Sequence, residues 1–174
     1  MKIIFSIFNK RVKLSKLSLK ELEEKVFTVQ NLWADSIVKI GKAYIEKENY
    51  FDLTNRFLDK LYFFNYGKVL FKPTKASKKQ FRRKKNEFIS YFIGHNQVSD
   101  EDKGFALEPY KNIQFDNFDF SVFENIIISM GNYFFTNYEN EKIKVEYSFG
   151  YILDEKEDEL KIIFHHSSIP YNID

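Results

Sequence analysis

Two adjacent histidines are followed by two adjacent serines near the end of the chain, at positions 165 to 168. A histidine with an unperturbed pKa of about 6.5 can exchange a proton near neutral pH. A serine hydroxyl both donates and accepts hydrogen bonds. Together these groups can orient a water molecule or receive a proton from it. The run is therefore the first candidate for a catalytic site.

The run ends an alternating segment that begins at Leu160 and predicts a strand. Side chains alternate between the two faces of a strand, so His166 and Ser168 would share a face with the apolar residues of Leu160 to Phe164. Because apolar side chains face a core, we expect His166 and Ser168 to point inward into a pocket, and the other two members of the run to point outward. The alternative is that both are ordinary buried polar groups without a catalytic role.

Adjacent histidines can also be metal ligands. His165 and His166 would lie on opposite faces of the strand, and the remaining histidine, His95, is predicted in a loop, so a three-histidine zinc site is hard to assemble. A mixed site with the acidic run Asp100 to Asp102 is the alternative. The chain has no cysteine, which excludes thiolate chemistry and cysteine-ligated metals. We expect no cofactor, with a divalent metal such as zinc or manganese as the alternative.

Helices are predicted to lead the fold. The first begins at a capping box formed by Ser18 and Glu21 and runs to about Tyr44, and the second begins around Tyr50. The third is predicted from about Ser77 to Phe92, ended by Gly94.

Two polar residues, Tyr91 and Thr74, belong to this third helix and to the loop before it. Tyr91 is expected on the inward face of the helix, together with the apolar Phe81. Thr74 is expected in the preceding loop, because Pro73 disfavours helical structure just before it. Both Tyr91 and Thr74 are thereby candidates for lining a pocket.

Strands are predicted beyond Gly104, where the hydrophobic period drops to two. The acidic segment 154–159 is expected to form the turn of the last hairpin. Gly131 falls inside a predicted strand, where glycine marks a bulge or a close backbone approach that bends the sheet. Helices followed by an antiparallel sheet indicate an α+β fold.

Composition indicates one globular domain. With 174 residues, 44% of them apolar, the chain suits a single core, and we expect a domain over residues 18–174 preceded by an N-terminal extension over 1–17. The formal charge of +2 argues against a nucleic-acid partner, and the eight basic residues of segment 72–85 are interpreted as a solvated surface. No segment approaches the ~20 apolar residues that span a bilayer. With no signal-peptide pattern either, we expect a cytoplasmic protein without a membrane partner.

Five ordered motifs along the chain resemble those of the iota-class carbonic anhydrases. The resemblance covers roughly residues 30 to 172. The motifs are Phe71-Lys72-Pro73-Thr74, Ser90-Tyr91-Phe92-Ile93-Gly94, Asp102-Lys103-Gly104-Phe105-Ala106, Met130-Gly131-Asn132-Tyr133-Phe134 and His165-His166-Ser167-Ser168-Ile169-Pro170-Tyr171. There are departures, since Phe164 stands where some members carry a further histidine, and Tyr110 stands where a tryptophan is expected.

The resemblance implies a fold and an activity. The fold would be a nuclear-transport-factor-2-like cone, with N-terminal helices packed on a curved antiparallel sheet that encloses a pocket. The activity would be reversible hydration of carbon dioxide to bicarbonate. Phe164 in place of a further histidine favours a mechanism without a metal, and an exposed face of the predicted sheet favours a homodimer. The family's catalytic positions fall on Thr74, Tyr91, His166 and Ser168 of this chain. Alternatives are a non-catalytic association module, similar to the association domain of calcium/calmodulin-dependent protein kinase, or a small-molecule-binding pocket protein.

Overall fold

The computed structural model describes residues 14–96 and 98–171. Most of the predicted N-terminal extension, residues 1–13, lies outside the described residues, but Leu14 at their start is buried in the core. The α-helices are α1 (Leu19–Ile45), α2 (Tyr50–Leu61) and α3 (Lys85–Ile93). The strands are β1 (Leu70–Lys72), β2 (Tyr110–Phe123), β3 (Ile126–Asn137), β4 (Lys142–Asp154) and β5 (Glu159–Ser168). Short 3-10 helices cover Leu14–Lys16 and Phe105–Leu107.

The helices begin where capping residues stand. The predicted capping box of α1 is confirmed. The Ser18 hydroxyl accepts a hydrogen bond from the backbone N–H of Glu21, and the Glu21 carboxylate accepts one from the backbone N–H of Ser18. Gly94 ends α3 with a left-handed φ of 64°, as predicted. None of the helices in the described part of the chain is long and apolar enough to span a bilayer.

The third helix begins later than predicted. The backbones of Phe71 and Arg82 exchange two hydrogen bonds, of 2.9 and 2.8 Å, which hold Arg82 in an extended conformation beside β1. The predicted helix therefore cannot run through Arg82, and α3 starts at Lys85. The prediction that Phe81 points inward was wrong, since 75% of its surface is exposed.

The five strands form one mixed sheet in the order β1-β5-β4-β3-β2. The predicted antiparallel hairpins are present, but β1 pairs with β5 in parallel, with Phe71 opposite His165. Opposite Gly131, β2 contains an irregularity in register between Asn117 and Asp119. A Cβ at Gly131 would lie 2.2 Å from the Asp116 carbonyl oxygen, so the predicted close approach is confirmed.

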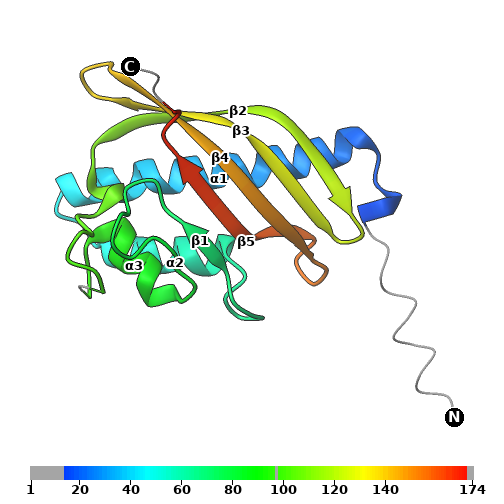
Figure 1. The fold of residues 1–174 in the computed structure, drawn as a ribbon, viewed down its shortest axis with the longest axis horizontal. Coiled ribbons are helices and arrows are strands. Elements are labelled where there is room, and N and C mark those ends of the chain that lie inside the picture. The colour runs from blue at the N-terminus through cyan, green and yellow to red at the C-terminus, as the bar shows by residue number, and fades with distance from the viewer. Residues whose placement is uncertain (1–13, 97, 172–174) are drawn as a thin grey trace, which may run out of the picture.

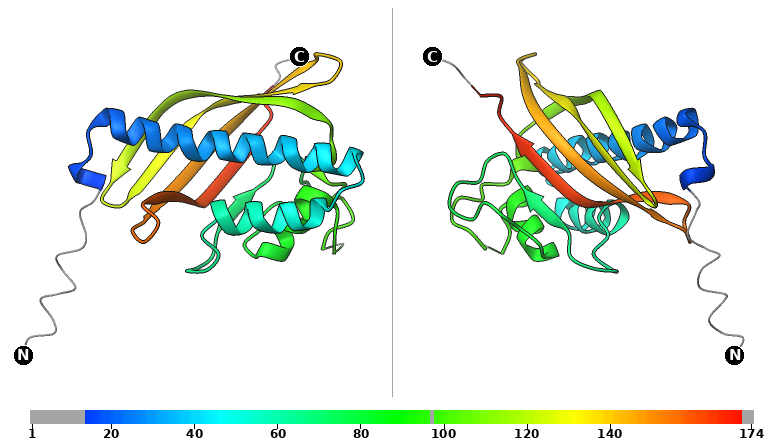
Figure 2. Two further views of the ribbon diagram at one scale, coloured as in Figure 1. Left: turned by 180° about the vertical axis from the view of Figure 1, so that it is seen from behind. Right: turned by 45° about the vertical axis from the view of Figure 1, so that its right-hand side comes forward.

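The helices cover one face of this curved sheet. Helix α1 runs along its concave side, with α2 and α3 beside it, and the sheet bends over all three (Figures 1 and 2). Trp33 of α1 lies at the centre of the core, in ring contact with aromatic residues of α2, α3 and the sheet. The predicted α+β fold of helices packed on a curved sheet is therefore confirmed.

A bulge in β5 changes which residues face the helices. Gly150 of β4 pairs with Phe164, whereas the next residue, Tyr151, pairs with Ile162, so Ile163 is an extra residue in β5. One extra residue reverses the alternation of side chains beyond it. Ile162 is buried before the bulge and His165 is buried after it, three positions later instead of two or four.

Candidate functional site

The bulge places His165 and Ser167 on the inner face of β5. They are 1% and 3% exposed, and His165 packs edge-to-face against the Phe149 ring at a centroid distance of 4.2 Å. The prediction that His166 and Ser168 point inward, with His165 and Ser167 outward, was wrong. It assumed a regular strand, and the extra residue Ile163 reverses the phase.

His166 and Ser168 lie on the outer face, in an open groove of about 350 Å³ that Met130 and Phe118 also line. Ser168 Oγ donates to Glu146 Oε2 at 3.1 Å. The pKa of His166 is lowered by partial burial and by nearby Lys72, against the opposing effect of Glu146.

The inner residues belong to a buried chain of hydrogen bonds. Trp33 Nε1 donates to the Tyr62 hydroxyl at 2.9 Å, and that hydroxyl contacts His165 Nδ1 at 3.0 Å. His165 Nε2 contacts Ser167 Oγ at 3.2 Å. Burial, and to a lesser degree the neighbouring His166, lower the pKa of His165 well below 6.5. His165 is therefore neutral at pH 7.

Two further hydroxyls adjoin Ser167. Because β1 runs parallel to β5, the chain beyond Phe71 follows the end of β5, and Lys72 Nζ donates to the Ser167 carbonyl oxygen at 3.2 Å. Thr74 lies in the turn after β1. Burial raises the pKa of Tyr133, and hydrogen-bonding contacts with Ser167 and Thr74 lower it by a smaller amount, so Tyr133 stays protonated. Thr74, Tyr133 and Ser167 thus form one group of hydroxyls.

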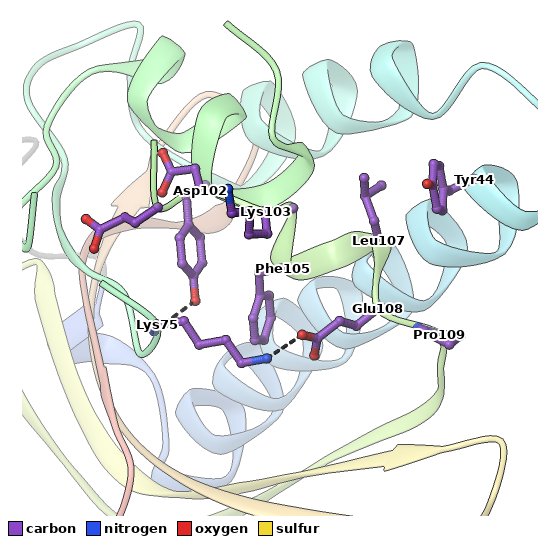
Figure 3. Close-up of a pocket in the computed structure, with 11 residues that line it drawn as sticks. Tyr44, Lys75, Asp102, Lys103, Phe105, Leu107, Glu108 and Pro109 are labelled. Carbon is purple, nitrogen blue, oxygen red and sulfur yellow. Dashed lines mark hydrogen bonds and ion pairs between the residues drawn. The ribbon is translucent and has the colours of Figure 1, made fainter. Parts of the chain in front are cut away.

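Tyr91 approaches this group from α3. The backbone N–H of Lys75, the residue after Thr74, donates to the Tyr91 hydroxyl at 3.5 Å. Burial raises the Tyr91 pKa above its ordinary value. Its ring lines a cleft of about 530 Å³, where Lys75 forms an ion pair with Glu108 beside Phe105 (Figure 3). The structure therefore brings Thr74 and Tyr91 together, as predicted. Their neighbours on β5 are His165 and Ser167, in place of the predicted His166 and Ser168.

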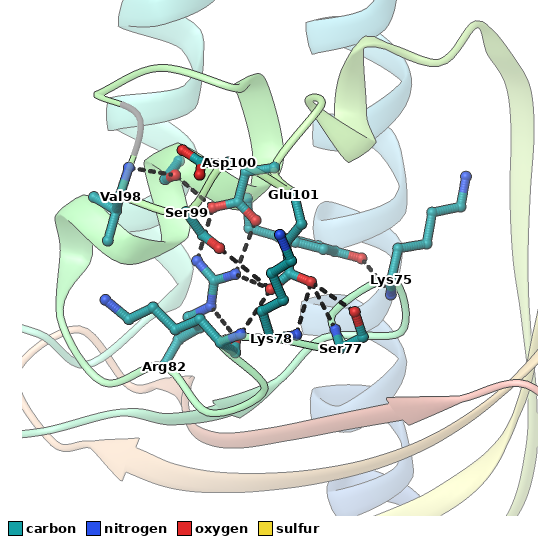
Figure 4. Close-up of polar contacts among 12 residues, drawn as sticks. Lys75, Ser77, Lys78, Arg82, Val98, Ser99, Asp100 and Glu101 are labelled. Carbon is teal, nitrogen blue, oxygen red and sulfur yellow. Dashed lines mark hydrogen bonds and ion pairs between the residues drawn. The ribbon is translucent and has the colours of Figure 1, made fainter.

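A buried ion pair holds the loop that carries Thr74. Arg82 and Asp102, whose side chains are 0% and 1% exposed, form two hydrogen bonds of 2.8 Å, and Ser90 also contacts Asp102. Glu101 accepts hydrogen bonds from three successive backbone amides, Ser77 to Lys79 (Figure 4). The basic segment 72–85 was expected to be a solvated surface, but Arg82 is buried in this ion pair. Part of the segment therefore has a structural role.

Comparison with known proteins identifies the family of the chain. A sequence model of the family described as metal-independent carbonic anhydrase matches residues 24–169. The chain is 32% identical over 152 residues to a metal-independent carbonic anhydrase from Nostoc sp. (strain PCC 7120), covering 86% of this chain and 74% of the relative.

The chain belongs to the metal-independent carbonic anhydrase family.

Solved structures agree with this membership. A cyanobacterial iota-carbonic anhydrase crystallised with bicarbonate is 31% identical, with a TM-score of 0.82 over 87% of this chain and 93% of that one. The predicted assignment to the iota class is confirmed, and the predicted hydration of carbon dioxide without a metal is the activity for which the family is named.

More distant structures share the fold alone. One is described as a calcium/calmodulin-dependent protein kinase II association domain from Xanthomonas campestris, with 14% identity and a TM-score of 0.54 over 92% of this chain and 93% of that one. Another, of the nuclear-transport-factor-2-like family from Streptomyces avermitilis, has 12% identity and a TM-score of 0.57, over 89% of this chain and the whole of that one. The predicted nuclear-transport-factor-2-like cone is confirmed.

The alternative metal site of the sequence analysis does not form. His95 packs on the Phe51 ring at a centroid distance of 4.7 Å, and Glu101 and Asp102 are engaged by backbone amides and Arg82. Among residues 14–96 and 98–171, no group of three histidine or carboxylate side chains has the geometry to hold a metal ion. The side chains at this carbonic anhydrase site are instead hydroxyls and one neutral imidazole.

Besides His165 and Ser167, which it placed on the outer face, sequence reasoning did not assign Trp33, Tyr62 and Tyr133 to the site. Tryptophan and tyrosine on apolar faces are typical of a core, so the pattern gave no signal that their polar atoms join a network. The bulge did leave a signal. Gly150 interrupts the alternation of β4, and an isolated glycine in a strand indicates a bulge or a close approach. A Cβ at Gly150 would lie 3.1 Å from that of Phe164.

Proposed function

We propose that this carbonic anhydrase hydrates carbon dioxide on the inner face of β5, using the hydroxyls of Thr74, Tyr91, Tyr133 and Ser167 together with His165. The observation that carries the assignment is the buried hydrogen-bonded pair His165–Ser167, 3.2 Å apart, beside the other hydroxyls. These replace His166 and Ser168, which the sequence had favoured and which face the outer groove.

Aromatic rings supply the apolar surroundings that carbon dioxide requires. Phe71 lies 4.7 Å from the His165 ring and 5.3 Å from the Tyr91 ring, measured between centroids. Substrate would enter from the cleft that Tyr91 and Phe105 line. Apolar walls with few polar groups are typical of small-molecule sites.

Hydration needs a water oxygen to bond to carbon while the water loses a proton. Without a metal to acidify the water, that proton must leave during attack. In this proposal the Thr74 hydroxyl receives the proton and gives its own hydrogen to the oxygen of carbon dioxide that gains an electron pair. The product is carbonic acid, which releases a proton to solvent and leaves as bicarbonate. No group of the site changes its charge.

Ser167 and the two tyrosines would hold the reacting atoms. Ser167 donates to the oxygen on which charge develops, which is how fixed hydroxyl and amide donors accelerate acyl chemistry. Burial keeps Tyr91 and Tyr133 protonated, so they act as hydrogen-bond donors and do not become phenolates. His165 holds the Ser167 hydroxyl in position through the hydrogen bond between them.

Stopped-flow hydration kinetics on exhaustively chelated protein test this function. We expect the chelated wild type to be active and Thr74→Val, which keeps the shape but removes the hydroxyl, to lose about 100-fold in kcat/KM. Thr54→Val is the matched control. Thr54 is buried in α2, and among the described residues its hydroxyl donates to the Tyr50 carbonyl oxygen of the same helix, at 2.8 Å.

Two outcomes would contradict the proposal. Activity that disappears on chelation and returns with one metal would overturn the metal-free mechanism. Full activity in Thr74→Val, or an equal loss in Thr54→Val, would remove Thr74 from the relay.

The predicted homodimer is proposed on the outer face of the sheet. Apolar side chains are exposed there on neighbouring strands, with Phe118 at 82%, Met130 at 49% and Ile128 at 44%. Such clusters are typical of interaction surfaces. Sedimentation velocity over a range of concentrations tests this, and a monomer throughout would contradict it. The cytoplasmic location stays a prediction.

A further inference from the structure

The chain of contacts behind His165 has a fixed direction at its start. An indole N–H can only donate, so the Tyr62 oxygen accepts from Trp33. The Tyr62 hydroxyl hydrogen then requires an acceptor, because the residue is 2% exposed and a buried donor without a partner is costly. Among the residues with described positions, the other hydrogen-bond partner of this hydroxyl is His165 Nδ1, at 3.0 Å.

This direction continues through the imidazole. A ring nitrogen that accepts a hydrogen bond carries no hydrogen, and a neutral imidazole carries its single hydrogen on the other nitrogen. The buried His165 is neutral, so its hydrogen is on Nε2 and is donated to Ser167 Oγ at 3.2 Å. Ser167 therefore accepts from His165 and keeps its own hydrogen to donate elsewhere.

We propose that Tyr62, oriented by Trp33, is a positioning residue that fixes the Nε2–H tautomer of His165 and so directs the Ser167 hydrogen toward the substrate oxygen. This inference rests on the proposed function for its purpose, though not for its geometry. If His165 took the Nδ1–H tautomer, Nε2 would accept the Ser167 hydrogen. The substrate oxygen would then lose its donor.

The geometry favours an orienting role over a purely packing one. The Tyr62 and His165 rings lie 6.3 Å apart at an interplanar angle of 20°, and the backbone of Tyr62, just after α2, pairs with Ile162 of β5, which holds Tyr62 beside the strand that carries His165. Tyr62 also packs on Phe57 and Phe88, so its ring has a structural role that a phenylalanine would preserve. Only the hydroxyl is specific to the proposed chain.

The test compares Tyr62→Phe with wild type in histidine-¹⁵N-labelled protein. Long-range ¹H–¹⁵N spectra at pH 7.5 report which ring nitrogen carries the hydrogen. We expect pure Nε2–H for His165 in the wild type and a substantial Nδ1–H population in Tyr62→Phe, with kcat lowered about tenfold and KM little changed. The change should be smaller than the ~100-fold cost of deleting a transition-state donor, because Ser167 is still present.

Tyr151→Phe is the matched control. Tyr151 is fully buried, and its hydroxyl contacts Gln30 at 3.3 Å and Ser129 at 3.4 Å, in a separate polar group. Its removal should leave the His165 tautomer unchanged.

The outcomes separate this inference from the proposed function. An Nδ1–H tautomer in the wild type, or pure Nε2–H retained in Tyr62→Phe, would overturn the positioning role even if the enzyme is active. An inactive wild type with an Nε2–H tautomer that Tyr62→Phe alters would overturn the function and uphold the geometry.

Discussion

The two faces of β5 carry the same chemical groups in different surroundings. On the inner face, His165 and Ser167 are buried, hydrogen-bonded to each other and enclosed by aromatic rings. On the outer face, His166 and Ser168 border an open groove, and Ser168 bonds to the exposed side chain of Glu146. Residue type alone therefore does not define the site. Burial decides which pair can orient substrate in surroundings that exclude bulk water.

The adjacent serines give the sharpest comparison between the faces. Ser167→Ala removes a buried donor, and we expect kcat/KM to fall about 100-fold or more, as when a single oxyanion donor is deleted. Ser168→Ala removes the same atom from the outer groove and should change kcat/KM by less than about twofold. Stopped-flow hydration of both chelated variants measures the difference. A larger loss in Ser168→Ala would reverse the assignment of the faces.

The histidines differ in their effect on stability with pH. The unfolded chain protonates His165 near pH 6.5, whereas the folded protein, in which burial lowers the pKa of His165 well below that value, does not. The free energy of unfolding should therefore decrease as pH falls below about 6.5, by up to about 1.4 kcal/mol per pH unit. The half-buried His166, with a pKa that is also lowered, contributes less.

Urea unfolding between pH 5 and 7.5 measures this slope above the range where most carboxyl groups titrate. His165→Gln should remove most of the slope, and His166→Gln should remove little. An equal slope in His165→Gln and wild type would mean that His165 is protonated in the folded protein, against its neutral role.

Much of the fold could be predicted from sequence because local chemistry determines it. The Ser18–Glu21 capping box starts α1, and the alternation around Tyr147 and Phe149 gives β4 its inner face. Gly131 marks a point where two backbones approach too closely for a side chain.

The orientation of the site could not be predicted in the same way. Alternation predicts facing only while register is unbroken, and the bulge at Ile163 depends on how β5 pairs with β4. The late start of α3 likewise depends on the pairing of Arg82 with Phe71 across the loop. Trp33 and Tyr62 join the site only because α1, the end of α2 and β5 meet in the core.

The position of bound bicarbonate tests the inner-face assignment most directly. A crystal structure of this chain grown with bicarbonate should show the anion under the concave side of the sheet, within hydrogen-bonding distance of Ser167 Oγ and the Thr74 hydroxyl. Bicarbonate bound only in the outer groove, against His166 and Ser168, would contradict the account.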